Sequence, residues 1–259
     1  MRFCSLGSGS QGNALLVQAC LGPDTEPVSF LVDCGLGLKE VEERIQSRGM
    51  SPDQLSFIVV THEHGDHIGG VSRLAKAYGL PVLATHGTLA AANGFDEGIR
   101  LIELQPSQPL QILGLSLEPI PVPHDAREPI CLRIEDSLHR LAVVTDLGHV
   151  TPHLVASLQD LDALFLEFNY DQAMLDNGPY PPSLKSRVGG DYGHLSNEAS
   201  AELLRKVLGR QMQVVIAAHL SQTNNHPDCV MRAVADIDWG ETHFECATQD
   251  SGLEWVSLK

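Results

Sequence analysis

Short apolar runs recur along the chain and alternate with amphipathic segments. A continuous run such as FIVVT at 57–61 is typical of a strand buried on both faces. Residues 38–48 instead mix charged and apolar side chains at helical spacing, and Gly49 is suited to end a helix. The same criteria predict strands at 13–20, 28–34, 57–61, 81–85, 110–122 (long or broken), 130–135, 140–145, 163–168 and 213–218, helices at 38–48, 69–79, 196–208 and 227–237, and two short strands within 242–258. The pattern therefore predicts a mixed α/β chain.

The segment 169–193 departs from this alternation. It holds Tyr170, Tyr180, three prolines and four glycines, and it predicts a long loop. A long loop inside a compact domain is usually functional, although a surface excursion without function is the alternative. The composition does not shift along the chain, so we expect one domain over residues 1–259.

The chain is strongly acidic, which limits how it could bind a polyanion. It carries 17 Lys and Arg against 33 Asp and Glu, a net charge of −16 with His neutral. This balance argues against a broad basic surface that binds phosphate backbones. It leaves open a nucleic acid substrate that is met at a local site.

The sequence also bears on where the protein works. No stretch approaches 18 apolar residues, so we expect no membrane span, and the N-terminal residues lack the apolar core of a secretory signal. The cysteines form no CxxC pair, and we expect reduced, mostly buried thiols in a cytoplasmic protein. They are Cys4, Cys20, Cys34, Cys131, Cys229 and Cys246.

A dense group of metal-ligand residue types follows the predicted strand 57–61. The motif THEHGDH at 61–67 places three histidines and an aspartate within six residues. A strand end is a rigid support, and the loop after it can direct several side chains to one point. Imidazole together with carboxylate suits Zn²⁺, Mn²⁺ or Fe²⁺. A polar loop that happens to be His-rich is the weaker alternative.

Three further candidates stand where other apolar strands end. They are His124 after IPVP, Asp146 after LAVVT and His219 after VVIAA. Ligands gather at the carboxyl ends of strands in α/β sheets, although each residue taken alone is more often structural. With the 61–67 motif they supply five histidines and two aspartates. That number is enough for two metals with an open water site, and too many for one catalytic zinc.

THEHGDH, followed in order by His124, Asp146 and His219, resembles the metallo-β-lactamase superfamily over almost the whole chain. Four stretches are further similar to the bacterial WalJ/YycJ-type hydrolases: SLGSGSQGN at 5–13, LEFNYDQAML at 166–175, GHLSNEAS at 193–200 and HLSQTNNHP at 219–227. That group is linked to DNA 5′-exonuclease or related phosphodiesterase activity. The resemblance implies a four-layer αββα sandwich with the metals at one edge of the two sheets.

The resemblance also implies how two divalent ions, Zn²⁺ or Mn²⁺ with Fe²⁺ also possible, would be bound. The first would be held by His62, His64 and His124, the second by Asp66, His67 and His219, and Asp146 would bridge both. Asp33 in LVDCG would orient ligands from behind, unless it is a simple turn residue. The metal pair would activate a shared water as the hydroxide that attacks the phosphate.

His194 is the most informative candidate that is not a ligand. It lies in GHLSNEAS, just before a predicted helix whose N-terminal N–H groups favour anions. By resemblance to nucleolytic relatives it is a candidate general acid or phosphate clamp, and Asp66 is counted with it as catalytic. The alternative is a histidine bonded to its own turn. Ser196 is expected to be an N-cap.

Other polar residues are candidates for contacting the substrate. Ser8, Ser10 and Asn13 form a loop that could line the metal cleft. Tyr170 or Tyr180 could stack on a base. The remaining candidates are Asn169, Lys185, Arg187, Asn224 and Asn225, of which the last two could also simply hold a turn.

We therefore predict a cytoplasmic dinuclear metal-dependent phosphodiesterase, a 5′-exonuclease acting on DNA. The resemblance also allows a homodimer, because members of the superfamily often form dimers. The alternative on the same scaffold is a glyoxalase-type thioesterase, a lactonase or a β-lactamase, since one fold hosts many chemistries. A metal protein with a binding or redox role is a third reading. The position of Asp146, where a lactamase more often has Cys, and the His194 motif favour phosphate. The metals, helped by Lys185 and Arg187, would supply the positive field that the chain as a whole lacks.

Overall fold

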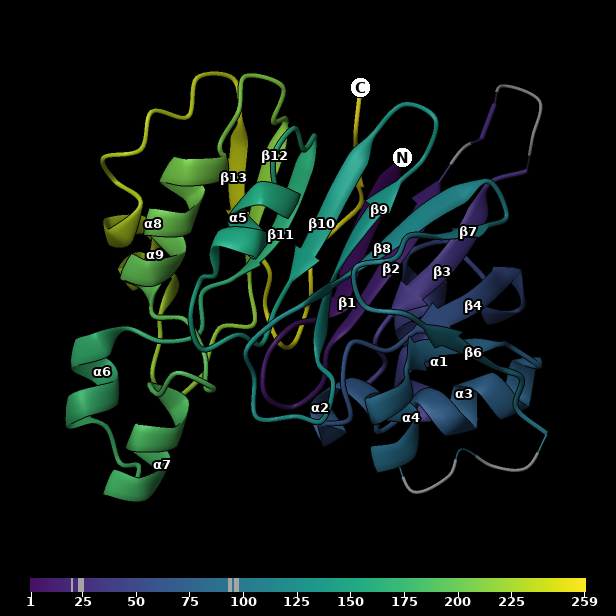
Figure 1. Ribbon diagram of the computed structural model, residues 1–259, viewed down its shortest axis with the longest axis horizontal. Helices are drawn as coiled ribbons and strands as arrows, with labels where there is room; N and C mark the ends of the chain where they lie inside the picture. The colour runs from purple at the N-terminus through teal and green to yellow at the C-terminus, as the bar shows by residue number, and fades with distance from the viewer. Residues whose placement is uncertain (20, 23–25, 93–94, 96–97) are drawn as a thin grey trace.

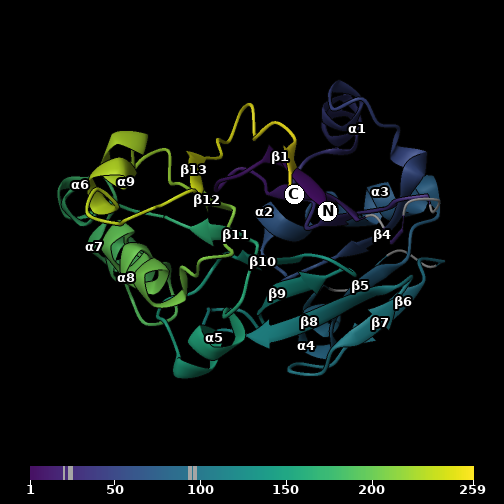
Figure 2. The same ribbon diagram turned by 90° about the horizontal axis from the view of Figure 1, so that it is seen from above.

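The computed structural model describes residues 1–259 apart from 20, 23–25, 93–94 and 96–97. Two seven-stranded sheets face each other, and helices cover their outer faces (Figures 1 and 2). The protein is therefore a single-domain α/β structure, and the αββα sandwich implied by the resemblance is confirmed.

Parallel strands bring the ends of several strands to one edge of the sandwich. In the first sheet β3 to β6 are parallel, and in the second β10 to β13 are parallel. The first sheet runs in the order β14 (Val256–Ser257), β1 (Arg2–Gly7), β2 (Ala14–Ala19), β3 (Val28–Val32), β4 (Leu55–Val59), β5 (Val82–Thr85) and β6 (Leu101–Leu104). The second runs in the order β13 (His243–Cys246), β12 (Val214–Ala218), β11 (Ala163–Glu167), β10 (Arg140–Val144), β9 (Ile130–Glu135), β8 (Leu115–Pro121) and β7 (Leu110–Ile112).

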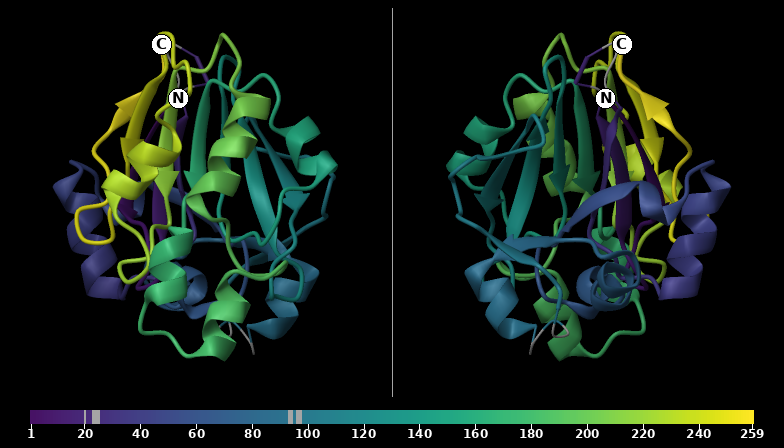
Figure 3. Two further views of the ribbon diagram at one scale, coloured as in Figure 1. Left: turned by 90° about the vertical axis from the view of Figure 1, so that its left-hand side faces the viewer. Right: turned by 90° about the vertical axis from the view of Figure 1, so that its right-hand side faces the viewer.

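Helices complete the two outer layers. The first sheet is covered by α1 (Leu38–Ser47), α3 (Val71–Tyr78) and α4 (His86–Ala91), with the short η1 (Pro52–Gln54) and α2 (Gly65–Ile68) beside them. The second is covered by α5 (Pro152–Ser157), α8 (Asn197–Val207) and α9 (Pro227–Ala233). Helices α6 (Gln172–Asn177) and α7 (Pro182–Val188) lie at the end of the sandwich opposite the two termini (Figures 1 and 3). Within the described residues, no helix has the length and apolar character needed to cross a membrane.

Strands buried on both faces explain the continuous apolar runs. Phe30 of β3 and Phe57 of β4 stack between the sheets, with ring centroids 4.6 Å apart. Their neighbours Leu31 and Ile58 point the other way and pack beneath the helices. Because successive strand side chains alternate between faces, both faces need apolar residues.

Most of the predicted elements are confirmed. Of the two possibilities for the segment 110–122, a long strand or a broken one, the structure shows the broken one. It forms β7 and β8, which pair antiparallel across Leu113 and Gly114, both at positive φ. The Ser196 side chain accepts a hydrogen bond from the Ala199 N–H, so Ser196 is the N-cap that we expected. The predicted helix 227–237 is shorter, because α9 ends at Ala233.

One expectation about local structure is wrong, and one strand was not predicted. The segment 169–193 is not a continuous loop, because it contains α6, capped by the Asp171 side chain, and α7, which begins at Pro182. Proline is favoured in the first turn of a helix, where its missing N–H costs nothing. The pattern also does not predict β1, because the glycines and serines that follow it suggest a loop, whereas β1 pairs with β2.

The cysteines other than Cys20, which lies outside the described residues, are free thiols, and all but Cys246 are buried. Burial raises the pKa of the Cys4 and Cys34 thiols to about 12. Because the thiolate is the reactive form, we expect these two to react with iodoacetamide about 10³-fold more slowly in the native protein than after unfolding. Peptide mass spectrometry of native and urea-unfolded samples measures both rates. Equal rates would contradict the expectation.

Candidate active site

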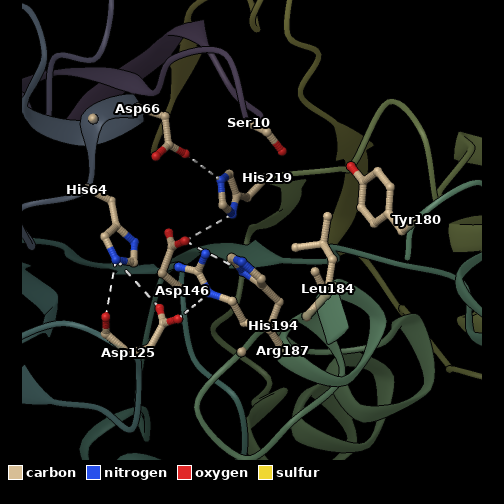
Figure 4. Close-up of a pocket in the computed structure, with 13 residues that line it drawn as sticks. Ser10, His64, Asp66, Asp125, Asp146, Tyr180, Leu184, Arg187, His194 and His219 are labelled. Atoms are coloured by element: carbon tan, nitrogen blue, oxygen red, sulfur yellow. Dashed lines mark hydrogen bonds and ion pairs between the residues drawn. The ribbon is translucent and has the colours of Figure 1, made fainter. Parts of the chain in front are cut away.

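The ends of six strands bring the site together at one edge of the sandwich. Asp33 follows β3, Glu167 ends β11, and the seven candidate ligands also come from strand ends. His62 and His64 follow β4, Asp66 and His67 lie on α2, His124 follows β8, Asp146 follows β10 and His219 follows β12. Residues as far apart in sequence as Ser10 and His219 thus meet in one pocket, much of which Figure 4 shows.

The first group of ligand atoms belongs to His62, His64 and His124. One ring nitrogen from each lies within 4.8 Å of the others. His124 Nε2 is 3.2 Å from His64 Nδ1. His62 and His124 are buried, whereas His64 stands closer to the pocket mouth. This is the set that the resemblance assigns to the first metal.

The second group consists of Asp66, His67 and His219, again within 4.8 Å of one another. Asp66 Oδ2 lies 3.4 Å from His219 Nε2 and 3.5 Å from His67 Nε2. Asp146 lies between the two groups, with Oδ2 3.1 Å from His67 Nε2 and Oδ1 3.9 Å from His124 Nε2. The structure thus places Asp146 where a carboxylate could reach both groups.

Two buried polar atoms in this cluster fit a metal site. His62 Nε2 and Asp146 Oδ2 have no hydrogen-bond partner among the described residues. A buried polar atom without a partner costs free energy, so such atoms are rare in folded proteins. A cation between the two groups would supply the missing partner to both. Nitrogen and carboxylate donors in this number suit divalent transition metals.

Backbone strain is concentrated at the same strand ends. Asp33, Asp146 and His219 have φ of 62°, 61° and 54°, in the left-handed region that residues with a side chain seldom adopt. Strained conformations of this kind persist where the surrounding structure holds them, and they cluster at functional sites. Here the left-handed turn ends each strand abruptly and directs the side chain into the site.

Asp33 contacts the His67 ring on the side away from the ligand cluster. Its Oδ2 lies 2.8 Å from His67 Nδ1 and accepts a hydrogen bond from the Thr61 hydroxyl at 2.8 Å, while Oδ1 accepts one from the Thr61 N–H. Oriented in this way, His67 presents Nε2 to the ligand cluster. This is the contact that the resemblance implies for Asp33, and it fixes both the ring orientation and the tautomer of His67.

Glu167 is a residue of the site that the sequence analysis did not single out. It is fully buried, and its Oε1 lies 2.8 Å from His194 Nδ1 and 3.0 Å from His219 Nδ1. Burial alone would raise its pKa, but the two histidines outweigh burial and lower the pKa of Glu167 to about 2. The available signal was a single carboxylate at the end of the apolar strand ALFLEF.

His194 lies beside the cluster and lines the pocket. Its Nδ1 is held by Glu167, so Nε2 is left for another partner. Burial alone would lower its pKa, but the charge of Glu167 and the bond to it raise the pKa of His194 above the usual value. His194 is therefore not merely bonded to its own turn, which was the alternative.

The pocket is a cavity of about 360 Å³ with one polar and one apolar wall. Asp66, Asp146, His194 and His219 form the polar wall. Helix α7 and the turn before it form the other, with Tyr180, Leu184 and Val188 (Figure 4). The volume is near the lower end of the range for small-molecule sites, roughly 300–1,000 Å³.

Only some of the residues predicted to contact the substrate line the cavity. Ser10 and Arg187 line the cavity, and so does Tyr180. Lys185 does not line it, because its ammonium group donates to the Asp176 carbonyl oxygen at 2.7 Å. Helix α7 thus directs Arg187 toward the pocket and Lys185 away from it.

Several of the others support the site from within the protein. The Ser8 hydroxyl accepts a hydrogen bond from the His219 N–H at 2.8 Å, and the Asn169 amide donates to the His219 carbonyl oxygen at 3.0 Å. The Asn13 amide lies 3.1 Å from His67 Nε2 and 3.3 Å from Asp66 Oδ2, so it touches the ligand cluster itself. All three side chains are buried, which gives them a positioning role in the structure.

Tyr170, Asn224 and Asn225 do not fit the expectation that they contact the substrate. Tyr170 is only 5% exposed, so its ring has no free face on which a base could stack. Asn225 is buried and donates to the Phe168 carbonyl oxygen at 2.7 Å, and the Asn224 N–H donates to the Ser221 hydroxyl. The asparagines hold the turn after β12, which was the alternative for them.

Comparisons with known proteins bear on the family and the fold. The β-lactamase superfamily domain matches residues 29–220. The exodeoxyribonuclease YycJ of Bacillus anthracis is 32% identical over 92% of this chain and 89% of its own length, and the exodeoxyribonuclease WalJ of Streptococcus pneumoniae is 31% identical over 86% and 83%. The crystal structure of the metallo-β-lactamase fold protein YhfI of Bacillus subtilis has a TM-score of 0.74 at 16% identity, covering 98% of both chains.

Proposed function

Because the chain belongs to the metallo-β-lactamase superfamily, and is thus a hydrolase, we propose that it is a dinuclear metal-dependent phosphodiesterase that cleaves DNA from the 5′ end. The observation that carries the proposal is the pair of ligand groups joined by Asp146 at the floor of the pocket. The relatives that share most of the chain's length are named exodeoxyribonucleases, which supports DNA as the substrate. The proposal places the enzyme in the cytoplasm, where its thiols would stay reduced.

One set of residues in the site would bind the metal ions, and another would transfer the proton. His62, His64 and His124 would hold one Zn²⁺ or Mn²⁺ ion, Asp66, His67 and His219 the other, and Asp146 would contact both. When bound, such ions lower the pKa of water and neutralise phosphate oxygens. Asp33 keeps His67 in the orientation that binding needs.

His194 would donate the proton that the leaving oxygen needs. Glu167 holds its Nδ1 at 2.8 Å, so Nε2 is the nitrogen left to meet the leaving oxygen. In this arrangement His194 is the general acid, and Glu167 is the positioning residue that keeps the imidazole protonated and aligned.

Metal content and substrate class test the proposal directly. The purified protein is expected to contain about two divalent ions per chain by inductively coupled plasma mass spectrometry. It should also hydrolyse bis-p-nitrophenyl phosphate and 5′-labelled single-stranded DNA, but not nitrocefin or a glutathione thioester. Hydrolysis of the thioester alone would contradict the proposal and favour a glyoxalase-type activity.

The acidity of the chain leads to a prediction about DNA binding. With a net charge of −16, the protein has little positive field of its own to hold a polyanion. After removal of metals with a chelator, we expect affinity for a DNA duplex at physiological salt to be no better than that of typical non-specific binding, roughly 10⁻⁴–10⁻⁶ M. Fluorescence anisotropy with labelled duplex measures it. Tight binding by the metal-free protein would contradict a metal-centred contact.

A further inference from the structure

Arg187 occupies a position in the pocket that the proposed chemistry does not yet use. It is the only Lys or Arg among the described residues that line the cavity. Its Nε donates to Asp125 Oδ2 at 2.6 Å, which holds the guanidinium group by one edge. In Figure 4 the two terminal nitrogens are turned away from Asp125. A guanidinium group fixed in this way can still donate two hydrogen bonds to an anion.

Asp125 fixes Arg187 relative to the ligand cluster. Its second oxygen, Oδ1, lies 3.5 Å from His64 Nε2 and 3.5 Å from His124 Nε2. One carboxylate thus joins the arginine to two of the candidate metal ligands, and it acts here as a positioning residue.

Close packing holds helix α7 against the loop that carries His194. A Cβ atom at Gly193 would lie 2.2 Å from the carbonyl oxygens of Arg187 and Val188, so only glycine allows this approach. The end of α7 is therefore seated on the backbone next to His194. This contact gives Arg187 a defined place beside the general acid.

Exposure separates two levels in the pocket. At the floor, the side chains of Asp146 and His219 are 3% and 2% exposed, whereas Arg187 is 61% exposed at the mouth. A phosphate bound between the metal sites lies at the floor. The guanidinium group at the mouth is therefore placed for a second phosphate, further along the same strand.

We propose that Arg187, positioned by Asp125, binds a backbone phosphate next to the one being cleaved, so that the site selects polynucleotide strands over isolated phosphodiesters. This inference rests on the proposed function. It also supplies a local cation in a chain of net charge −16, where no wide basic surface is expected.

Two substrates with the same leaving group test the inference. Dithymidine monophosphate has one phosphate, whereas in a single-stranded oligothymidine the phosphodiester at the 5′ end is followed by a second phosphate. Arg187→Ala is expected to lower kcat/KM for the oligothymidine about 10- to 100-fold, which is typical of a lost hydrogen-bonded contact to a charged group. For dithymidine monophosphate the loss should stay below about threefold. The slope of log kcat/KM against log salt for the oligothymidine should become shallower by about 0.7, the value for one single-strand phosphate contact.

Arg205→Ala provides the matched control. Arg205 makes an exposed ion pair of the same length, 2.6 Å to Asp236, on α8 outside the cavity. We expect the Arg205→Ala variant to keep the parent kcat/KM for both substrates. Equal losses on both substrates in Arg187→Ala, or no loss on either, would overturn the inference, provided that metal content is unchanged. If the unaltered protein hydrolyses neither bis-p-nitrophenyl phosphate nor oligothymidine, the proposed function itself fails, which is a separate result.

Discussion

Replacing Asp146 with Asn is expected to lower both metal content and the rate of phosphodiester hydrolysis. The side chain keeps its size but loses the charge that faces His67 at 3.1 Å and lies within 3.9 Å of His124. Loss of a partner behind a metal ligand typically costs 10- to 100-fold in affinity or activity. Because Asp146 would contact both ions directly, we expect a loss in kcat of more than about 10²-fold. Metal analysis and hydrolysis of bis-p-nitrophenyl phosphate measure the two effects.

Asp162→Asn is the control for this substitution. Asp162 lies just before β11, at the opposite end of this strand from Glu167, and accepts a hydrogen bond from the Arg140 N–H. The same chemical change there should leave metal content and rate close to those of the parent protein. A variant Asp146→Asn with unchanged metal and unchanged rate would exclude the bridging role.

Replacing His194 with Ala is expected to reduce kcat on an oligonucleotide by roughly 10²- to 10⁴-fold, the range for removal of a general acid. The structural reason is that His194 lines the pocket and its Nδ1 is held by Glu167, which leaves Nε2 as the nitrogen that can donate a proton. A p-nitrophenolate group leaves readily without a proton. The loss on bis-p-nitrophenyl phosphate should therefore be much smaller, at unchanged metal content.

His149→Ala gives the matched comparison. His149 is an exposed histidine whose Nδ1 bonds to the Asp191 carbonyl oxygen, and it does not line the cavity. We expect the His149→Ala variant to keep the parent kcat on both substrates. An equal loss on both substrates in His194→Ala would mean that His194 positions the metals or the phosphate, and is not the proton donor. This pattern also differs from that of Arg187→Ala, which depends on a neighbouring phosphate and not on the leaving group.

Much of the site could be predicted because its signals are local. The four candidate ligands in THEHGDH follow one buried strand, and His124, Asp146 and His219 each follow another. Strand ends are readable from short apolar runs, and parallel strands end at one edge. The resemblance then ordered these residues into two groups, and the structure brings the members of each group within 4.8 Å of one another.

Glu167 and Tyr170 show where local signals fail. Glu167 looks like one polar residue at the end of an apolar strand, and only its contacts with His194 and His219 reveal its place in the site. Tyr170 lies in a polar segment typical of a surface loop, yet it is buried in the folded chain. Burial depends on which distant segments pack together, and no single segment carries that information.

The sequence by itself determined the class of fold, the chemical types at the site and the strand ends that present them. These features depend on side-chain periodicity and residue type, which are written along the chain. Only the tertiary structure decided which polar residues face the cavity. Arg187 and Lys185 are two residues apart on one short helix, and both looked suited to bind a phosphate. The helix turns one toward Asp125 and the pocket and the other toward the Asp176 carbonyl, because successive helical side chains point in different directions and the packing of α7 against Gly193 fixes which one faces inward.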